Sequence, residues 1–169
     1  DAHSFVWMIN EAKSHYITKE MWMEILDNAT LLKANDIEYI KHFYNAPMHT
    51  ATCSAMSRIT GVPISTYNLA IGSAGKRIAN HLNFRINRRE EGGDRGWSVI
   101  FRGHYREDRL FDWQVKPELA EALENAYPEI RVNTTAINTI IKNRIISANE
   151  YEADNEERLE ISSNDSITK

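Results

Sequence analysis

The chain has 169 residues, 42% hydrophobic and 26% charged, a balance typical of one globular domain with or without an appendage. No apolar run approaches the roughly 20 residues that cross a bilayer, and the chain start lacks the basic and apolar regions of a signal peptide, so we expect neither membrane insertion nor export. The single cysteine, Cys53, excludes an intrachain disulfide, and we expect a buried structural thiol in a reducing, cytoplasmic environment.

Charge separates along the chain. The net charge is −4, yet residues 41–106 contain ten basic and three acidic residues, a net of +7, whereas the end from Glu150 contains seven acidic and two basic residues. A basic centre followed by an acidic, weakly apolar end is typical of a nucleic-acid-binding head that precedes a linker.

The first half of the chain has the apolar spacing of helices. Thr18 is a helix cap, Pro47 breaks the second helix, and Gly61 stops the third. We therefore predict helices over residues 18–33, from Asp36 to Tyr44, from Thr50 to about residue 60, and from about Ser65 to Leu82 with a pause or kink at Gly72 and Gly75.

Beyond residue 83 the spacing of apolar residues changes from that of a helix to every second residue, as in a strand. "FRIN" (84–87), "WSVIFRG" (97–103) and "FDWQVK" (111–116) alternate apolar and polar residues, as half-buried antiparallel strands do. Pro117 suits the first turn of a closing helix. Isoleucines at helical spacing in residues 133–148 predict another helix, with a strand as the alternative because of the isoleucine content.

These elements predict an α+β fold, with a helical N-terminal half, a short antiparallel sheet and closing helices. We expect a helical extension over 1–34, a winged-helix-like domain over 35–130, a C-terminal helix over 131–149, and an acidic linker or tail over 150–169.

The stretch "NLAIGSAGKRIANHLN" (68–83) places two glycines before Lys76 and Arg77. It is not a nucleotide-binding P-loop, because Ala70 and Arg77 stand where the loop needs glycine and a hydroxyl residue. Two interpretations remain. A glycine-relieved helix start beside two cations would hold a nucleic-acid phosphate; alternatively, the glycines let two elements pack closely and the cations are solvated.

The helices over 50–60 and 65–72, joined by a glycine-containing turn, have the order of a helix-turn-helix. The start of the second helix would read base edges, because asparagine can pair with adenine and threonine can contact a thymine methyl. A basic loop with Arg88, Arg89 and Arg95 would form the wing, and the other cations would hold phosphates. An ordinary helical hairpin is the alternative. The predicted DNA-contacting residues are Arg58, Ser65, Thr66, Tyr67, Asn68, Lys76, Arg77, Arg85, Arg88, Arg89 and Arg102.

Three aromatic residues, Trp97, Tyr105 and Trp113, flank the second strand pair. Core packing is the expected role of the two tryptophans, and a stacking platform for a flipped base is the alternative. His104 and the acidic residues that follow it could also bind a metal ion and cleave DNA. The alternative is that these residues form an ordinary charged surface loop. The acids concerned are Glu107, Asp108 and Asp112.

Residues 49–82 ("HTATCSAMSRITGVPISTYNLAIGSAGKRIANHL") and 96–123 ("GWSVIFRGHYREDRLFDWQVKPELAEAL") resemble the N-terminal DNA-recognition domain of bacterial restriction endonucleases of the HNH or modification-dependent type. The resemblance covers roughly residues 35–125. It implies DNA recognition, in some members of methylated DNA, and no catalysis by this domain. The positions that carry it are Asn68, Gly72, Lys76, Arg77, Trp97, Phe111, Trp113 and the "KPEL" of 116–119.

We therefore expect a non-catalytic head that binds double-stranded DNA, methylated or not, without a cofactor, as part of a longer protein with a C-terminal nuclease domain. Homodimerisation is a further expectation. The alternatives are a protein-interaction or oligomerisation module whose basic face is incidental, and the metal-dependent nuclease described above.

Overall fold

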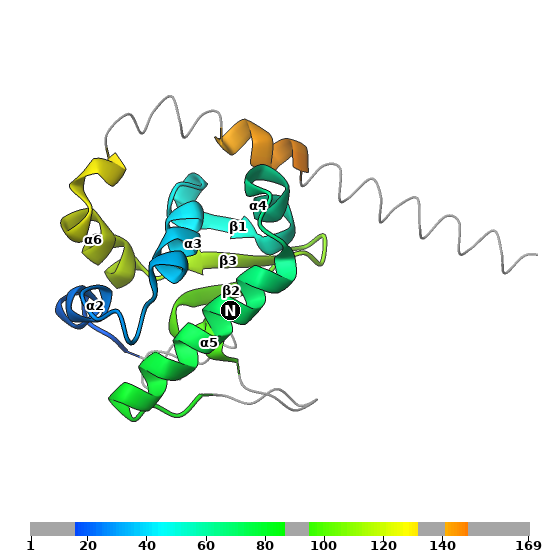
Figure 1. Ribbon diagram of the computed structural model, residues 1–169. Helices are drawn as coiled ribbons and strands as arrows, with labels where there is room; N and C mark the ends of the chain where they lie inside the picture. Colours follow the sequence, from blue (N-terminus) through cyan, green and yellow to red (C-terminus); the bar gives the residue numbers. More distant parts are fainter. Residues whose placement is uncertain (1–15, 87–94, 132–140, 149–169) are drawn as a thin grey trace, which may run out of the picture.

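The computed structural model describes residues 16–86, 95–131 and 141–148 (Figure 1). This part of the chain is a mixed α+β fold, in which helices predominate and three short strands form one antiparallel sheet. The predicted fold class is confirmed. The predicted acidic tail, residues 150–169, lies outside the described residues.

α2 (Lys19–Leu26) begins at the predicted cap. The hydroxyl of Thr18 accepts a hydrogen bond from the backbone N–H three residues further on, at 3.2 Å. The helix ends earlier than the predicted residue 33, because the side chain of Asn28 accepts a hydrogen bond from the Thr30 N–H at 3.0 Å and so stabilises a turn.

α3 (Ala34–Tyr44) begins before its predicted first residue. The carboxylate of Asp36 lies inside the first turn and accepts a hydrogen bond from the Lys33 N–H at 2.9 Å. A short 3-10 turn, η1 (Pro47–His49), follows where the proline was expected to break the helix.

A strand that the sequence pattern missed precedes the next helix. β1 (Thr50–Thr52) occupies the residues predicted to cap that helix, and the cap is Thr52, whose hydroxyl accepts an N–H at 3.0 Å from the first turn of α4 (Cys53–Thr60). α4 ends at Gly61, whose φ of 78° lies in the left-handed region that glycine adopts readily.

α5 (Ile64–Leu82) runs without interruption through both glycines, so the predicted pause or kink is wrong. The glycines serve close packing instead. The 3-10 turn η2 (Gly96–Val99) crosses the helix at Gly72 and Gly75, and a side chain on either Gly75 or Gly96 would overlap a backbone carbonyl of the opposite element.

The sheet has the order β1-β3-β2, with β3 (Phe111–Val115) at its centre and both neighbours antiparallel. β2 (Phe101–Tyr105) is shorter than predicted, because residues 96–99 form η2. The predicted strand over 84–87 is also wrong in its described part, 84–86. Asn83, at φ 55°, and the Phe84 N–H, which donates to a carbonyl of α5 at 2.8 Å, instead end that helix.

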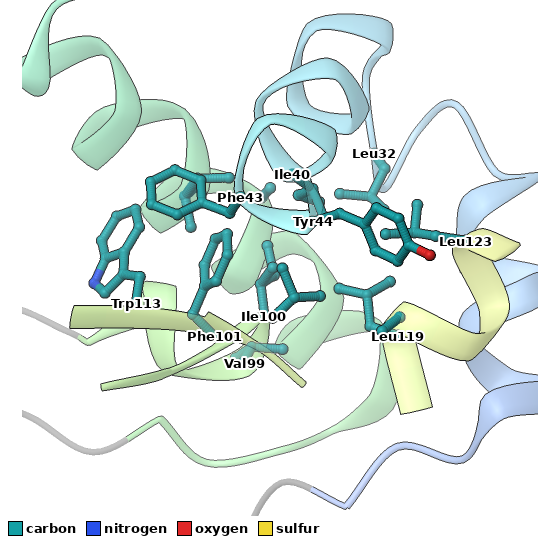
Figure 2. Close-up of a cluster of buried hydrophobic side chains, with 14 of the residues drawn as sticks. Leu32, Ile40, Phe43, Tyr44, Val99, Ile100, Phe101, Trp113, Leu119 and Leu123 are labelled. Atoms are coloured by element: carbon teal, nitrogen blue, oxygen red, sulfur yellow. The ribbon is translucent and has the colours of Figure 1, made fainter. Parts of the chain in front are cut away.

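The aromatic core joins α3 to the inner face of the sheet (Figure 2). The Phe43 ring lies 5.0 Å from the Phe101 ring and 5.7 Å from Trp113, and Phe101 and Trp113 stack at 5.0 Å. All three side chains are buried, and rings of this size supply much of a core's apolar area.

α6 (Pro117–Ala126) begins at the predicted proline and covers the other end of this core with Leu119 and Leu123 (Figure 2). It packs against α2 (Figure 1). A helix over residues 141–148, drawn in orange in Figure 1, lies against α4 and adds Ile145 to the same cluster of buried residues.

Candidate nucleic-acid interface

The first two turns of α5 present polar side chains to solvent. Ser65 and Asn68 are exposed, and Thr66 is half-buried between them. Leu69, which the sequence argument did not select, is 73% exposed beside Asn68. An apolar side chain this exposed among hydrogen-bonding neighbours is suited to contact a ligand surface that combines polar edges with methyl groups.

The start of α5 also leaves backbone donors available. Pro63 precedes the helix, no side chain caps it, and the first turn contains no acidic residue. The first N–H groups of an uncapped helix carry partial positive charge and attract anions. A helix start suited to an anion therefore exists, but at Ile64 rather than at the expected position beside Lys76.

Tyr67 is not a base reader in this structure, contrary to the prediction. It is fully buried, and its hydroxyl lies 2.8 Å from Nδ1 of His42 and 2.7 Å from the hydroxyl of Thr60. Burial raises the pKa of Tyr67 to about 12. The signal that could have shown this is helical spacing, since Tyr67 is in line with the buried residues Ile71 and Ile78 of the same helix.

His42 is the partner of Tyr67 on α3. Burial lowers the pKa of His42, and the Glu38 carboxylate, 3.8 Å from its Nε2, opposes part of that effect. The neutral imidazole is therefore the form that the folded state favours, linked by hydrogen bonding to the buried hydroxyl of α5.

The two adjacent cations of α5 have different surroundings. Lys76 is exposed. Arg77 donates to the buried carboxylate of Asp36 at 2.8 Å and to the Leu31 carbonyl at 3.1 Å, so it ties α5 to the start of α3. The prediction that both side chains are exposed is wrong for Arg77, which is half-buried and whose guanidinium neutralises a buried charge. Phosphate binding by Lys76 and Arg77 stays a prediction.

The strand predicted to begin the wing does not form over residues 84–86. Arg88 and Arg89 lie outside the described residues, and Arg95 is exposed at the start of η2. The hairpin of the sheet is β2–β3, and its tip is residues 106–110.

Four interactions order this tip. The Arg106 N–H donates to the Leu110 carbonyl at 2.8 Å, the Arg109 N–H donates to the Arg106 carbonyl at 3.0 Å, and the Asp108 carboxylate accepts from both the Leu110 N–H at 3.1 Å and the Arg106 guanidinium at 2.9 Å. Arg109, at φ 68°, is exposed, and its side chain pairs with no other residue in the described part of the chain. Arg109 was not among the predicted residues, because the wing was expected in the loop of Arg88, Arg89 and Arg95.

The remaining predicted cations are at the surface. Arg58, Arg85 and Arg102 are exposed, and Arg102 lies on the outer face of β2 opposite Gln114. Arg58 donates to the carbonyl of Ala148 at 3.3 Å, which connects α4 to the helix over 141–148.

Two of the three candidate stacking residues are packed inside. Trp113 is 3% exposed, and Trp97 lies 6.1 Å from Trp113 and 5.2 Å from Phe111, between ring centroids. Gly103 makes room for the Trp97 ring, which a side chain there would overlap. Core packing is thus the role of both tryptophans, and the base-stacking alternative is wrong for the buried Trp113. Tyr105 is 73% exposed, and its ring meets that of Phe111 edge-on, with 4.8 Å between the ring centroids.

The metal-dependent alternative finds no support in the geometry. In residues 16–86, 95–131 and 141–148, no three His, Cys, Asp or Glu side chains gather closely enough to hold a metal ion. His104 and Asp112 face each other across the hairpin. Burial raises the pKa of Asp112, while Arg106 and then His104 oppose that effect. Burial also raises the pKa of Cys53 to about 12, as expected for a structural thiol.

None of the helices in the described part of the chain combines the length and apolar character needed to span a membrane. Comparison with protein-family models, curated proteins and solved structures found no match to this chain.

Proposed function

We propose that this chain binds double-stranded DNA, with the first two turns of α5 in the major groove and the tip of the β2–β3 hairpin as the wing. The order α3, β1, α4, α5, β2, β3, with β3 between the other strands, supports this assignment, because a helix-turn-helix followed by a hairpin has this order. Ser65, Thr66, Asn68 and Leu69 would then face base edges.

The observation that carries the proposal is the excess of lysine and arginine over acidic residues in the segments around α4, α5 and β2. Residues 39–86 and 95–106 contain eight lysines and arginines and no aspartate or glutamate. Arg77 and Arg106 are paired with acids from outside these segments, and exposed cations remain on α4, α5 and β2. A surface of this kind attracts a polyanion, and contacts to phosphates would orient the duplex without reading its sequence.

The salt dependence of affinity tests this proposal directly. Neutralising Z phosphates gives a slope of log affinity against log salt of about −0.9Z, so four to six contacts give a slope of about −3.6 to −5.4. The measurement is fluorescence anisotropy with a labelled duplex of mixed sequence. A salt-independent affinity, or no binding at low salt, contradicts the proposal and leaves the protein-interaction module as the better reading.

We further propose, from the resemblance to restriction-enzyme heads, that the bound duplex is selected by sequence or by base modification. Asn68 and Leu69 would distinguish bases, because an amide pairs with adenine and an apolar side chain contacts a C5 methyl group. Competition between methylated and unmethylated duplexes of the same sequence tests this part, and equal competition by every duplex contradicts it.

A further inference from the structure

A groove of about 390 Å³ lies between α4 and the helix over residues 141–148. Figure 1 shows this helix, in orange, lying against α4. The hydrogen bond from the Arg58 guanidinium to the Ala148 carbonyl, at 3.3 Å, holds the two elements together at the groove. The lining residues are Arg58, Ile59, Asn143, Arg144, Ser147 and Ala148.

The side chains that line the groove could bind a phosphate group together with the carbon atoms of an adjoining sugar ring. Two guanidinium groups, a side-chain amide and a hydroxyl provide donors, the Ile59 and Ala148 side chains provide apolar surface, and none of the described residues that line it is a carboxylate. Arginine binds phosphate through two parallel N–H donors. Arg144 is exposed, and its side chain forms neither an ion pair nor a hydrogen bond with any residue in the described ranges.

The groove is close along the chain to the proposed recognition helix. Ile59, in its wall, precedes the first residue of α5, Ile64, by five residues. Five residues span at most ~18 Å, which corresponds to about five base pairs along the axis of B-DNA at 3.4 Å each. The wall of the groove at Ile59 is therefore within about five base pairs' length of the start of α5.

We propose that this groove binds a backbone phosphate and the adjoining deoxyribose of DNA, outside the base pairs that α5 approaches. The inference rests on the proposed function and extends it to a helix that the sequence argument did not connect with DNA. Arg144 provides the charge-assisted donors, and Arg58 both holds the helix in place and flanks the phosphate.

The test compares Arg144→Ala with Lys142→Ala, in the full chain. Lys142 is exposed on the same helix but does not line the groove. Both variants lose one positive charge, and they differ in whether that charge lies at the groove. Losing one phosphate contact makes the slope of log affinity against log salt shallower by about 0.9. When salt is raised from about 50 to about 200 mM, the factor by which affinity drops should therefore be about 3.5 times smaller for Arg144→Ala than for the parent. Lys142→Ala should keep the parent's slope, and Arg144→Lys should restore part of the loss.

Three results would overturn the inference. Equal slopes for Arg144→Ala and Lys142→Ala would show that the groove adds no contact of its own, while the proposed function would stand. An Arg144→Ala variant that binds DNA more tightly than the parent would indicate that the groove holds a competing acidic segment. A parent that does not bind DNA at low salt would remove the proposed function itself. Ethylation interference on the parent complex should also reveal a sensitive phosphate that becomes insensitive in Arg144→Ala.

Discussion

The contact between α5 and η2 makes two glycines of one helix respond oppositely to the same substitution. In Gly75→Ala the new Cβ would lie 1.7 Å from the carbonyl oxygen of Gly96, a backbone atom that cannot rotate away. Overpacking of this kind costs about 1–3 kcal/mol, and the better helix propensity of alanine returns about 1 kcal/mol. Because the clash is with backbone, we expect the upper end of the range, a net loss of about 2 kcal/mol in the free energy of unfolding.

Gly72→Ala is the matched control. Its Cβ would meet no atom within 4 Å, so the substitution should raise stability by about 0.5–1 kcal/mol through helix propensity alone. The two variants should thus differ by about 3 kcal/mol, or about 6–12 °C in Tm for a chain of this size.

Urea unfolding of the parent and both variants measures this difference. Equal stability of Gly72→Ala and Gly75→Ala would refute the close contact between α5 and η2. It would also reopen the interpretation that the glycines interrupt the helix to bind an anion.

Three further predictions concern single side chains. Asn68→Ala should change base preference more than overall affinity, since a lost bidentate pair costs about 1–3 kcal/mol at one base pair; equal losses across a panel of single-base variants would rule this out. Arg77→Ala should lower the free energy of unfolding by about 1–3 kcal/mol, because it leaves the buried carboxylate of Asp36 without its partner. Lys76→Ala should leave stability unchanged and weaken binding to every duplex alike. Urea unfolding measures the first effect and anisotropy the second, and the reverse pattern contradicts the structure. Because burial lowers the pKa of His42, the unfolded chain takes up its proton more readily, so stability should fall as the pH drops below about 6.5; the fall should be shallower in His42→Gln, and an unchanged pH profile would exclude this linkage.

Elements with strong local signals were predictable from the sequence. Pro117 and the apolar spacing of Leu119 and Leu123 located α6, and Gly61 located the end of α4, because these residues act through their own backbone or the adjacent turn. Base-reading and phosphate-binding residues were proposed from the same kind of local pattern. Of these, the residues exposed in the described part of the chain are Arg58, Ser65, Asn68, Lys76, Arg85 and Arg102.

Features that depend on distant partners were not predictable in this way. β1 has three residues, too few for a period, and it exists because Ala51 pairs with Trp113 of β3. Arg77 resembles a surface cation in the sequence because its partner, Asp36, is 41 residues away. The strand predicted over residues 84–87 is wrong in its described part because the Phe84 backbone caps the end of α5, and an apolar residue there fits both a helix end and a strand start.

The most direct test of DNA binding by α5 is to place a negative charge on its exposed face. Leu69 is 73% exposed, so Leu69→Glu should fold with the parent's stability. The new carboxylate should weaken DNA binding, because it would repel phosphates or be buried against base edges without a hydrogen-bond donor. Met23→Glu, at a partly exposed position on α2, is the control for the added charge. By anisotropy at low salt, we predict that Leu69→Glu binds duplex DNA at least about tenfold more weakly than the parent while Met23→Glu binds it within about threefold. Equal affinities of the two variants would contradict the placement of the DNA on α5.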